Sequence, residues 1–141
     1  MTQQIEHIRI SKYGNEFRAG GSIIKDYLQQ ILNMNLGEKQ KAFYEWILRN
    51  GRSFGALKEI TNPKIREILT RYRYSGSTKQ CFYNSQLSSL DSPLQYYEGY
   101  YVTEYPIVIE HGWNVYNGQV VDFTAHHNRI TVREYFGIKI P

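Results

Sequence analysis

The chain of 141 residues contains a single cysteine, Cys81, and little that would place it outside the cell or in a membrane. One thiol cannot form an intramolecular disulfide, and a lone cysteine in a polar chain is typical of a reducing compartment. Residues 1–10 lack the apolar segment of a secretory signal, and no apolar run approaches membrane-spanning length. We therefore expect a cytoplasmic protein with no membrane partner.

Metal-binding spacing is also missing. The sequence has no Cys-x-x-Cys or His-x-x-x-His pattern. His126 and His127 are adjacent, so in an extended loop, where we place them, their side chains would point to opposite sides. We expect no zinc site and no cofactor.

Charge of one sign is concentrated in one half of the chain. Residues 1–80 contain 14 Lys and Arg against 7 Asp and Glu, whereas residues 81–141 contain 3 against 6. A basic half can meet nucleic acid or an acidic protein, although solvated Lys and Arg on helices are the commoner explanation. The 13 tyrosines favour a macromolecular partner without identifying one.

Apolar periodicity predicts helices in the first half and strands in the second. Helices are expected after the N-cap Ser22, over Glu38–Asn50 with Phe43, Trp46 and Ile47 on its apolar face, over Phe54–Ile60, and from Pro63 after the N-cap Asn62. Strands are expected over 96–104, 107–116, 119–124 and 130–135, paired in chain order as an antiparallel meander. Helices followed by strands indicate an α+β fold in one domain of residues 1–141, with a mainly helical portion (1–76) and a helix plus antiparallel sheet (77–141).

Asn117-Gly118, between two runs of β-forming residues, predicts a tight hairpin because both residues tolerate positive φ. Pairing outward from this turn places Val115 opposite Val120, Trp113 opposite Asp122, and His111 opposite Thr124. His111 and Asp122 then become diagonal neighbours on one face, with Cα atoms about 7–8 Å apart, close enough for a side-chain hydrogen bond.

Cys81 is expected in the first turn of a helix over about 78–90, where the helix dipole favours a thiolate. A thiol nucleophile needs a base to deprotonate it and a third group to orient that base. Cys81, His111 and Asp122 supply all three.

These segments resemble the transglutaminase-like branch of the papain-like cysteine enzymes, which includes the small leader peptidases of lasso-peptide biosynthesis. The resemblance is carried by residues 80–84, 98–100, 111–114 and 120–124, all in the C-terminal half. Phe123 stands where the family usually has proline, and Gly112 where alanine is common. The resemblance implies a papain-like core and a Cys-His-Asp triad.

Four further residues are candidates around the triad. Gln80 and Asn84 could stabilise an oxyanion, although Gln80 is adjacent to the cysteine and the Cys81 N–H is the safer donor. Trp113 would shield the His-Asp hydrogen bond, with plain sheet packing as the alternative. Glu98 could select a basic substrate group, and an extended peptide could lie along a sheet edge beside it.

The leading hypothesis is a cysteine-dependent acyl-transfer enzyme (peptidase, deamidase or transglutaminase-like) that acts on a polypeptide or other amide substrate. The alternative is a non-enzymatic binding protein whose basic helical half engages nucleic acid or an acidic protein. We expect no specific nucleic-acid binding. The sequence leaves the substrate, the acyl acceptor and the oligomeric state open.

Overall fold

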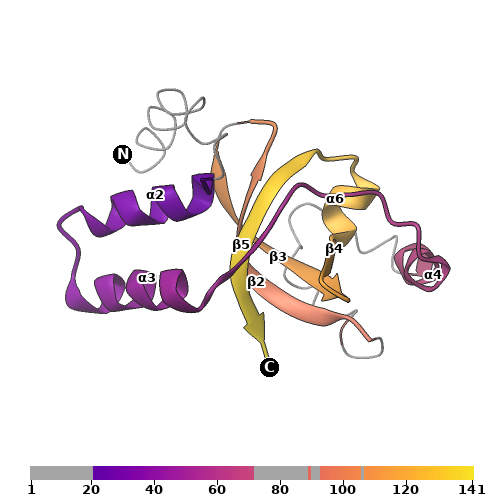
Figure 1. Cartoon of the computed structure of the whole chain (residues 1–141), viewed down its shortest axis with the longest axis horizontal. Coiled ribbons are helices and arrows are strands. Elements are labelled where there is room, and N and C mark those ends of the chain that lie inside the picture. The colour runs from indigo at the N-terminus through magenta and orange to yellow at the C-terminus, as the bar shows by residue number, and fades with distance from the viewer. Residues whose placement is uncertain (1–20, 72–88, 90–92, 106) are drawn as a thin grey trace.

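Helices and an antiparallel five-stranded sheet make up the part of the chain that the structure describes, so the α+β prediction is confirmed. The computed structural model describes residues 21–71, 89, 93–105 and 107–141 (Figure 1). The helices are α2 (Ile23–Leu32), α3 (Glu38–Asn50), α4 (Pro63–Arg71) and α6 (Phe123–His127). The strands are β1 (Arg52–Phe54), β2 (Gln95–Thr103), β3 (Val108–Tyr116), β4 (Gln119–Val121) and β5 (Val132–Ile140).

The starts of α2 and α4 follow their capping residues, as predicted. The Ser22 hydroxyl accepts the Lys25 N–H at 3.0 Å, and the Asn62 side chain accepts the Lys64 N–H at 2.9 Å. Each cap satisfies a backbone donor that the first helical turn leaves without a partner. These helix starts are therefore fixed by local chemistry.

Two predictions for the N-terminal portion are wrong. The helix expected over Phe54–Ile60 is absent, because Phe54 ends strand β1 and pairs with Tyr135 of β5. This pairing buries the Phe54 ring against Tyr97 and Trp113, which the local sequence does not reveal. On α3, Phe43, Trp46 and Ile47 were expected to share an apolar face; Ile47 is buried, but Phe43 and Trp46 are 48% and 43% exposed.

The sheet has the order β1-β5-β2-β3-β4, with every neighbouring pair antiparallel. Strands β2, β3 and β4 form the predicted meander. The meander does not extend to β5, which pairs with β2 and not with β4. After the short β4, helix α6 turns the chain away, and the nine-residue β5 finds a full-length partner in the nine-residue β2.

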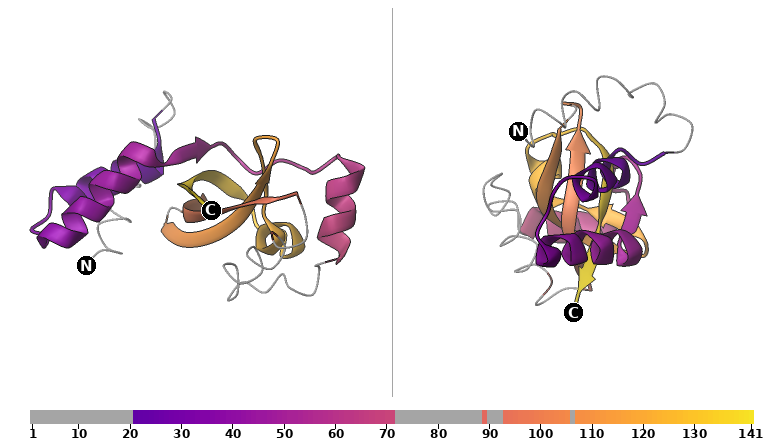
Figure 2. Two further views of the ribbon diagram at one scale, coloured as in Figure 1. Left: turned by 90° about the horizontal axis from the view of Figure 1, so that it is seen from below. Right: turned by 90° about the vertical axis from the view of Figure 1, so that its left-hand side faces the viewer.

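One face of the sheet is covered by helices and the other by a cluster of side chains (Figure 2). Helices α2 and α3 pack on one face, where Ile24 and Leu28 meet Val102 and Phe136. An aromatic cluster fills the other face and includes Trp113. Helix α4 lies at the far end of the molecule from α2 and α3 (Figures 1 and 2). The described helices include none that is long and apolar enough to cross a bilayer.

Two glycines allow the central strands to carry this aromatic cluster. Gly99 of β2 pairs with Gly137 of β5. A Cβ on Gly99 would overlap the Phe136 carbonyl, and a Cβ on Gly137 would lie 2.7 Å from the Trp113 indole. The paired glycines therefore leave room beside Trp113 for large rings.

Candidate active site

His111 and Asp122 form a buried hydrogen-bonded pair at the hairpin. The His111 Nε2 lies 2.7 Å from the Asp122 Oδ2, and the two side chains are 2% and 1% exposed. The turn between their strands has positive φ at Asn117 (49°) and Gly118 (77°), and Val115 pairs with Val120 as predicted. The tight turn therefore brings His and Asp together.

The outer part of the predicted register is wrong. Strand β4 ends at Val121, so Asp122 does not pair with Trp113, and Thr124 does not pair with His111. Asp122 is instead the N-cap of α6, and its Oδ1 accepts the Ala125 N–H at 3.0 Å. The backbone of Asp122 is still extended (φ −113°, ψ 99°). Its side chain therefore leaves the chain as it would from one more strand residue, and it reaches His111.

Asp122 accepts three hydrogen bonds. Besides those from His111 and Ala125, the Tyr135 hydroxyl donates to Oδ2 at 2.7 Å. Burial alone would raise the pKa of the Asp122 carboxyl, but the neighbouring His111 and the bonds from Ala125 and Tyr135 outweigh it and hold this pKa below its usual value. Burial and the same carboxylate raise the pKa of Tyr135, so the hydroxyl stays a donor.

This chemistry fixes the imidazole tautomer. An ionised Asp122 only accepts hydrogen bonds, so the proton of the His111 pair must lie on Nε2. In the neutral ring, the lone pair is then on Nδ1. Asp122 thus orients the ring and leaves Nδ1 as its basic atom.

Aromatic rings surround the imidazole. Tyr101 stacks on His111 with the ring centroids 3.8 Å apart and the planes 9° from parallel. His111 pairs with Gly99 of β2, which has no side chain to occupy the space that the Tyr101 ring fills. Trp113 is fully buried, and its ring lies 6.2 Å from that of His111. Trp113 stacks on Tyr97, as plain sheet packing requires, and its shielding of the His-Asp hydrogen bond remains a prediction.

Sequence reasoning missed Tyr135 and Tyr101 as parts of this site. Tyr135 reaches Asp122 through the pairing of β5 with β2, whereas Tyr101 is a diagonal neighbour of His111 across the β2–β3 pairing. A meander places β5 elsewhere, so no local signal pointed to Tyr135; Tyr101 required the register between β2 and β3, which no short turn fixes. The Asp122 cap did have a signal, because aspartate is a favoured N-cap.

Cys81, Gln80 and Asn84 lie outside the described residues, and their predicted roles remain predictions. Glu98 lies on β2 opposite Gly112, so it points to the sheet face away from His111, and it accepts a hydrogen bond from the Tyr96 hydroxyl. A substrate peptide was expected along a sheet edge beside Glu98. That position is wrong, because β2 is paired with a strand on both sides and offers no free edge. The outer strands of the described sheet are β1 and β4.

The two adjacent histidines were predicted in a loop, which is wrong. His126 and His127 are in the last turn of α6, the helix that Asp122 begins. Burial lowers the pKa of His126. Within the described ranges, no three His, Cys, Asp or Glu side chains are grouped as metal ligands.

Comparisons of the chain with protein-family models, with curated proteins and with solved structures find no match.

Proposed function

We propose that the protein is a cysteine-dependent acyl-transfer enzyme that acts on an amide bond, with a papain-like, transglutaminase-like arrangement of its reacting groups. The observation that carries this proposal is the 2.7 Å bond between His111 and Asp122, made by two buried side chains. Burying an acid and a base together stabilises a fold only when the geometry is good, and such pairs are frequent in reacting sites.

In the proposed mechanism, Cys81 is the nucleophile. Nδ1 of His111 takes the thiol proton, and the thiolate sulfur attacks the carbonyl carbon of the amide. The resulting imidazolium gives the same proton to the leaving amine, and a thioester to Cys81 remains. Asp122 holds the tautomer throughout and balances the imidazolium charge.

The surroundings of His111 support this cycle. A positive imidazolium is favoured by the Asp122 carboxylate and by the near-parallel face of Tyr101 at 3.8 Å. The Tyr135 hydroxyl holds the carboxylate from a second direction. Because these partners are buried with the pair, water does not weaken the interactions.

The thioester then needs an acceptor. Water would give a peptidase or deamidase, and an amine would give a transglutaminase-like enzyme. The residues proposed here perform either step without a cofactor. A thiol nucleophile also suits the reducing cytoplasm, where we propose that the enzyme works.

Alkylation tests this proposal directly, because Cys81 is the only thiol in the chain and the mass gain from iodoacetamide therefore reports on it alone. At pH 6, native protein should react at least about tenfold faster than urea-unfolded protein, whose thiol has a pKa near about 8.5. His111→Ala and Asp122→Asn should remove most of that difference. An acyl probe should label the wild type and not Cys81→Ala.

Slower alkylation of the native than of the unfolded protein at every pH, with no acyl labelling, would identify Cys81 as a structural thiol. The His-Asp pair would then serve to anchor α6 to the sheet. In that case the alternative, a binding protein that uses its basic helical half, becomes the better hypothesis. Its signature is nucleic-acid affinity that falls steeply with salt.

A further inference from the structure

A concave site lies on the sheet face opposite His111. A pocket of about 240 Å³ is formed where α3 crosses strands β2, β3 and β5. Its walls include Phe43 and Tyr44 of α3 and Tyr100 of β2. The volume is below the range of about 300–1,000 Å³ that is usual for small-molecule sites, and it suits the end of one side chain.

Two carboxylates border this pocket. Glu110 pairs directly with Tyr100 across β2 and β3, and Glu98 is two residues from Tyr100 on the same strand. The two glutamates are therefore diagonal neighbours on one face, with Cα atoms about 7–8 Å apart. Their charges have no counterpart in the pocket, whose lining contains no Lys or Arg, and Glu110 forms no ion pair with any described residue.

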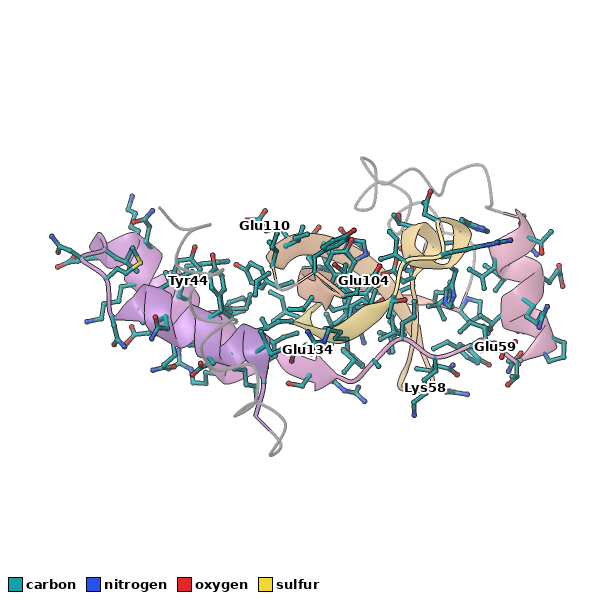
Figure 3. All side chains as sticks on the ribbon, turned by 90° about the horizontal axis from the view of Figure 1, so that it is seen from above. Tyr44, Lys58, Glu59, Glu104, Glu110 and Glu134 are labelled. Atoms are coloured by element: carbon teal, nitrogen blue, oxygen red, sulfur yellow. The ribbon has the colours of Figure 1, made fainter. Side chains whose placement is uncertain are left out.

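The hydroxyl of Tyr100 adds a second and independent feature. Tyr100 is only 8% exposed and lines the pocket, yet its hydroxyl makes no hydrogen bond to another residue in the described part of the chain. The hydroxyl oxygen itself is not sealed from solvent, so it offers a ligand in the pocket a hydrogen-bond partner beside the two carboxylates. Tyr44 of α3 and Glu110 of β3, both labelled in Figure 3, also line the pocket.

We propose that this pocket binds the guanidinium group of an arginine side chain on a polypeptide partner. A guanidinium has five N–H donors in one plane, which can bridge two separated carboxylates and a phenol oxygen. Its flat faces also stack on aromatic rings such as Phe43 and Tyr44. A lysine ammonium supplies the charge but not the planar fork.

This site does not depend on the proposed acyl transfer. Glu110 and His111 are consecutive on β3, so their side chains leave the sheet on opposite faces. A partner held at Glu110 therefore binds without entering the space around His111. The assigned role is docking.

The test uses the full-length protein and three peptides with blocked ends, Gly-Gly-Xaa-Gly-Gly, in which Xaa is Arg, Lys or Gln. Calorimetry at low salt should give a Kd near or below about 1 mM for the Arg peptide, weaker binding for Lys, and none for Gln. Glu110→Gln should weaken Arg-peptide binding about tenfold. Glu104→Gln removes the same charge from an exposed residue outside the pocket, and should leave the Kd within about twofold.

Four results would overturn the proposal. Equal binding of the Arg and Gln peptides would remove the guanidinium as ligand, and equal or tighter binding of the Lys peptide would remove its planar recognition. If Glu110→Gln and Glu104→Gln weaken Arg-peptide binding equally, the attraction comes from the overall charge of the protein and not from this pocket. The fourth ligand is agmatine, a small molecule with a guanidinium group and no peptide. Binding of agmatine without binding of the Arg peptide would contradict a polypeptide partner. Circular dichroism of each variant checks the fold.

Discussion

Removing one hydroxyl at Tyr135 should measure how strongly the fold holds the Asp122 carboxylate. Tyr135→Phe deletes the 2.7 Å hydrogen bond to Oδ2 and keeps the fully buried ring. A hydrogen bond to a charged group contributes about 1.5–3 kcal/mol. Asp122 keeps its bonds from His111 and Ala125, so neither of its oxygens is left without a partner, and the cost should be near the lower end, about 1.5 kcal/mol.

Thermal unfolding followed by circular dichroism gives this cost. With an unfolding entropy of about 2.1 cal/mol/K per residue, a chain of 141 residues loses about 5 °C in Tm for 1.5 kcal/mol. Tyr97→Phe is the matched control, because Tyr97 is buried on the same sheet face and its hydroxyl makes no hydrogen bond among the described residues. It should shift Tm by less than about 2 °C.

The stability difference between wild type and Tyr135→Phe should depend on pH with a definite sign. The pKa of Asp122 is below its usual value in the folded protein, so its contribution is complete above the unfolded pKa of about 3.9 and is lost as the pH falls through the folded pKa. Tyr135→Phe removes one cause of that lowering and so raises the pKa of Asp122. The stability gap between wild type and variant should therefore be constant above about pH 5 and shrink in acid. A gap that persists unchanged at low pH, or a Tyr97→Phe effect of equal size, would refute this reasoning.

Two further predictions concern the sheet and its helical cover. Gly99→Ala forces a Cβ into the Phe136 carbonyl and should cost about 2 kcal/mol or more in urea unfolding, whereas Gly55→Ala, with open space around it, should cost no more than about 0.5 kcal/mol; similar values would contradict the close approach. Glu134, labelled in Figure 3, accepts hydrogen bonds from the Ser22 hydroxyl and from the Ile24 N–H of α2, and burial raises its pKa. The folded state then binds more protons, so wild-type stability relative to Glu134→Gln should fall as the pH rises from about 4.3; a rise would show that the hydrogen bonds outweigh burial.

The sequence by itself determined the features that depend on a few neighbouring residues. The capped starts of α2 and α4 and the Asn117-Gly118 turn follow from side-chain caps and from residues that accept positive φ. The pairing of His111 with Asp122 followed from that turn, because a two-residue hairpin fixes the register close to it. The prediction failed further out, where the Asp122 cap ended the strand.

Only the tertiary structure decided which distant segments meet. Whether β5 pairs with β4 or β2 depends on the total area that each arrangement buries, and the local sequence of β5 is compatible with both. That choice brings Tyr135 to the His-Asp pair and draws residues 52–54 into a strand. The packing of α3 on the sheet likewise leaves Phe43 exposed beside the pocket bordered by Glu98 and Glu110. Backbone dihedrals and caps act over a few residues, whereas burial is shared by the whole chain, and so the surroundings of both sites could not be predicted from any single segment.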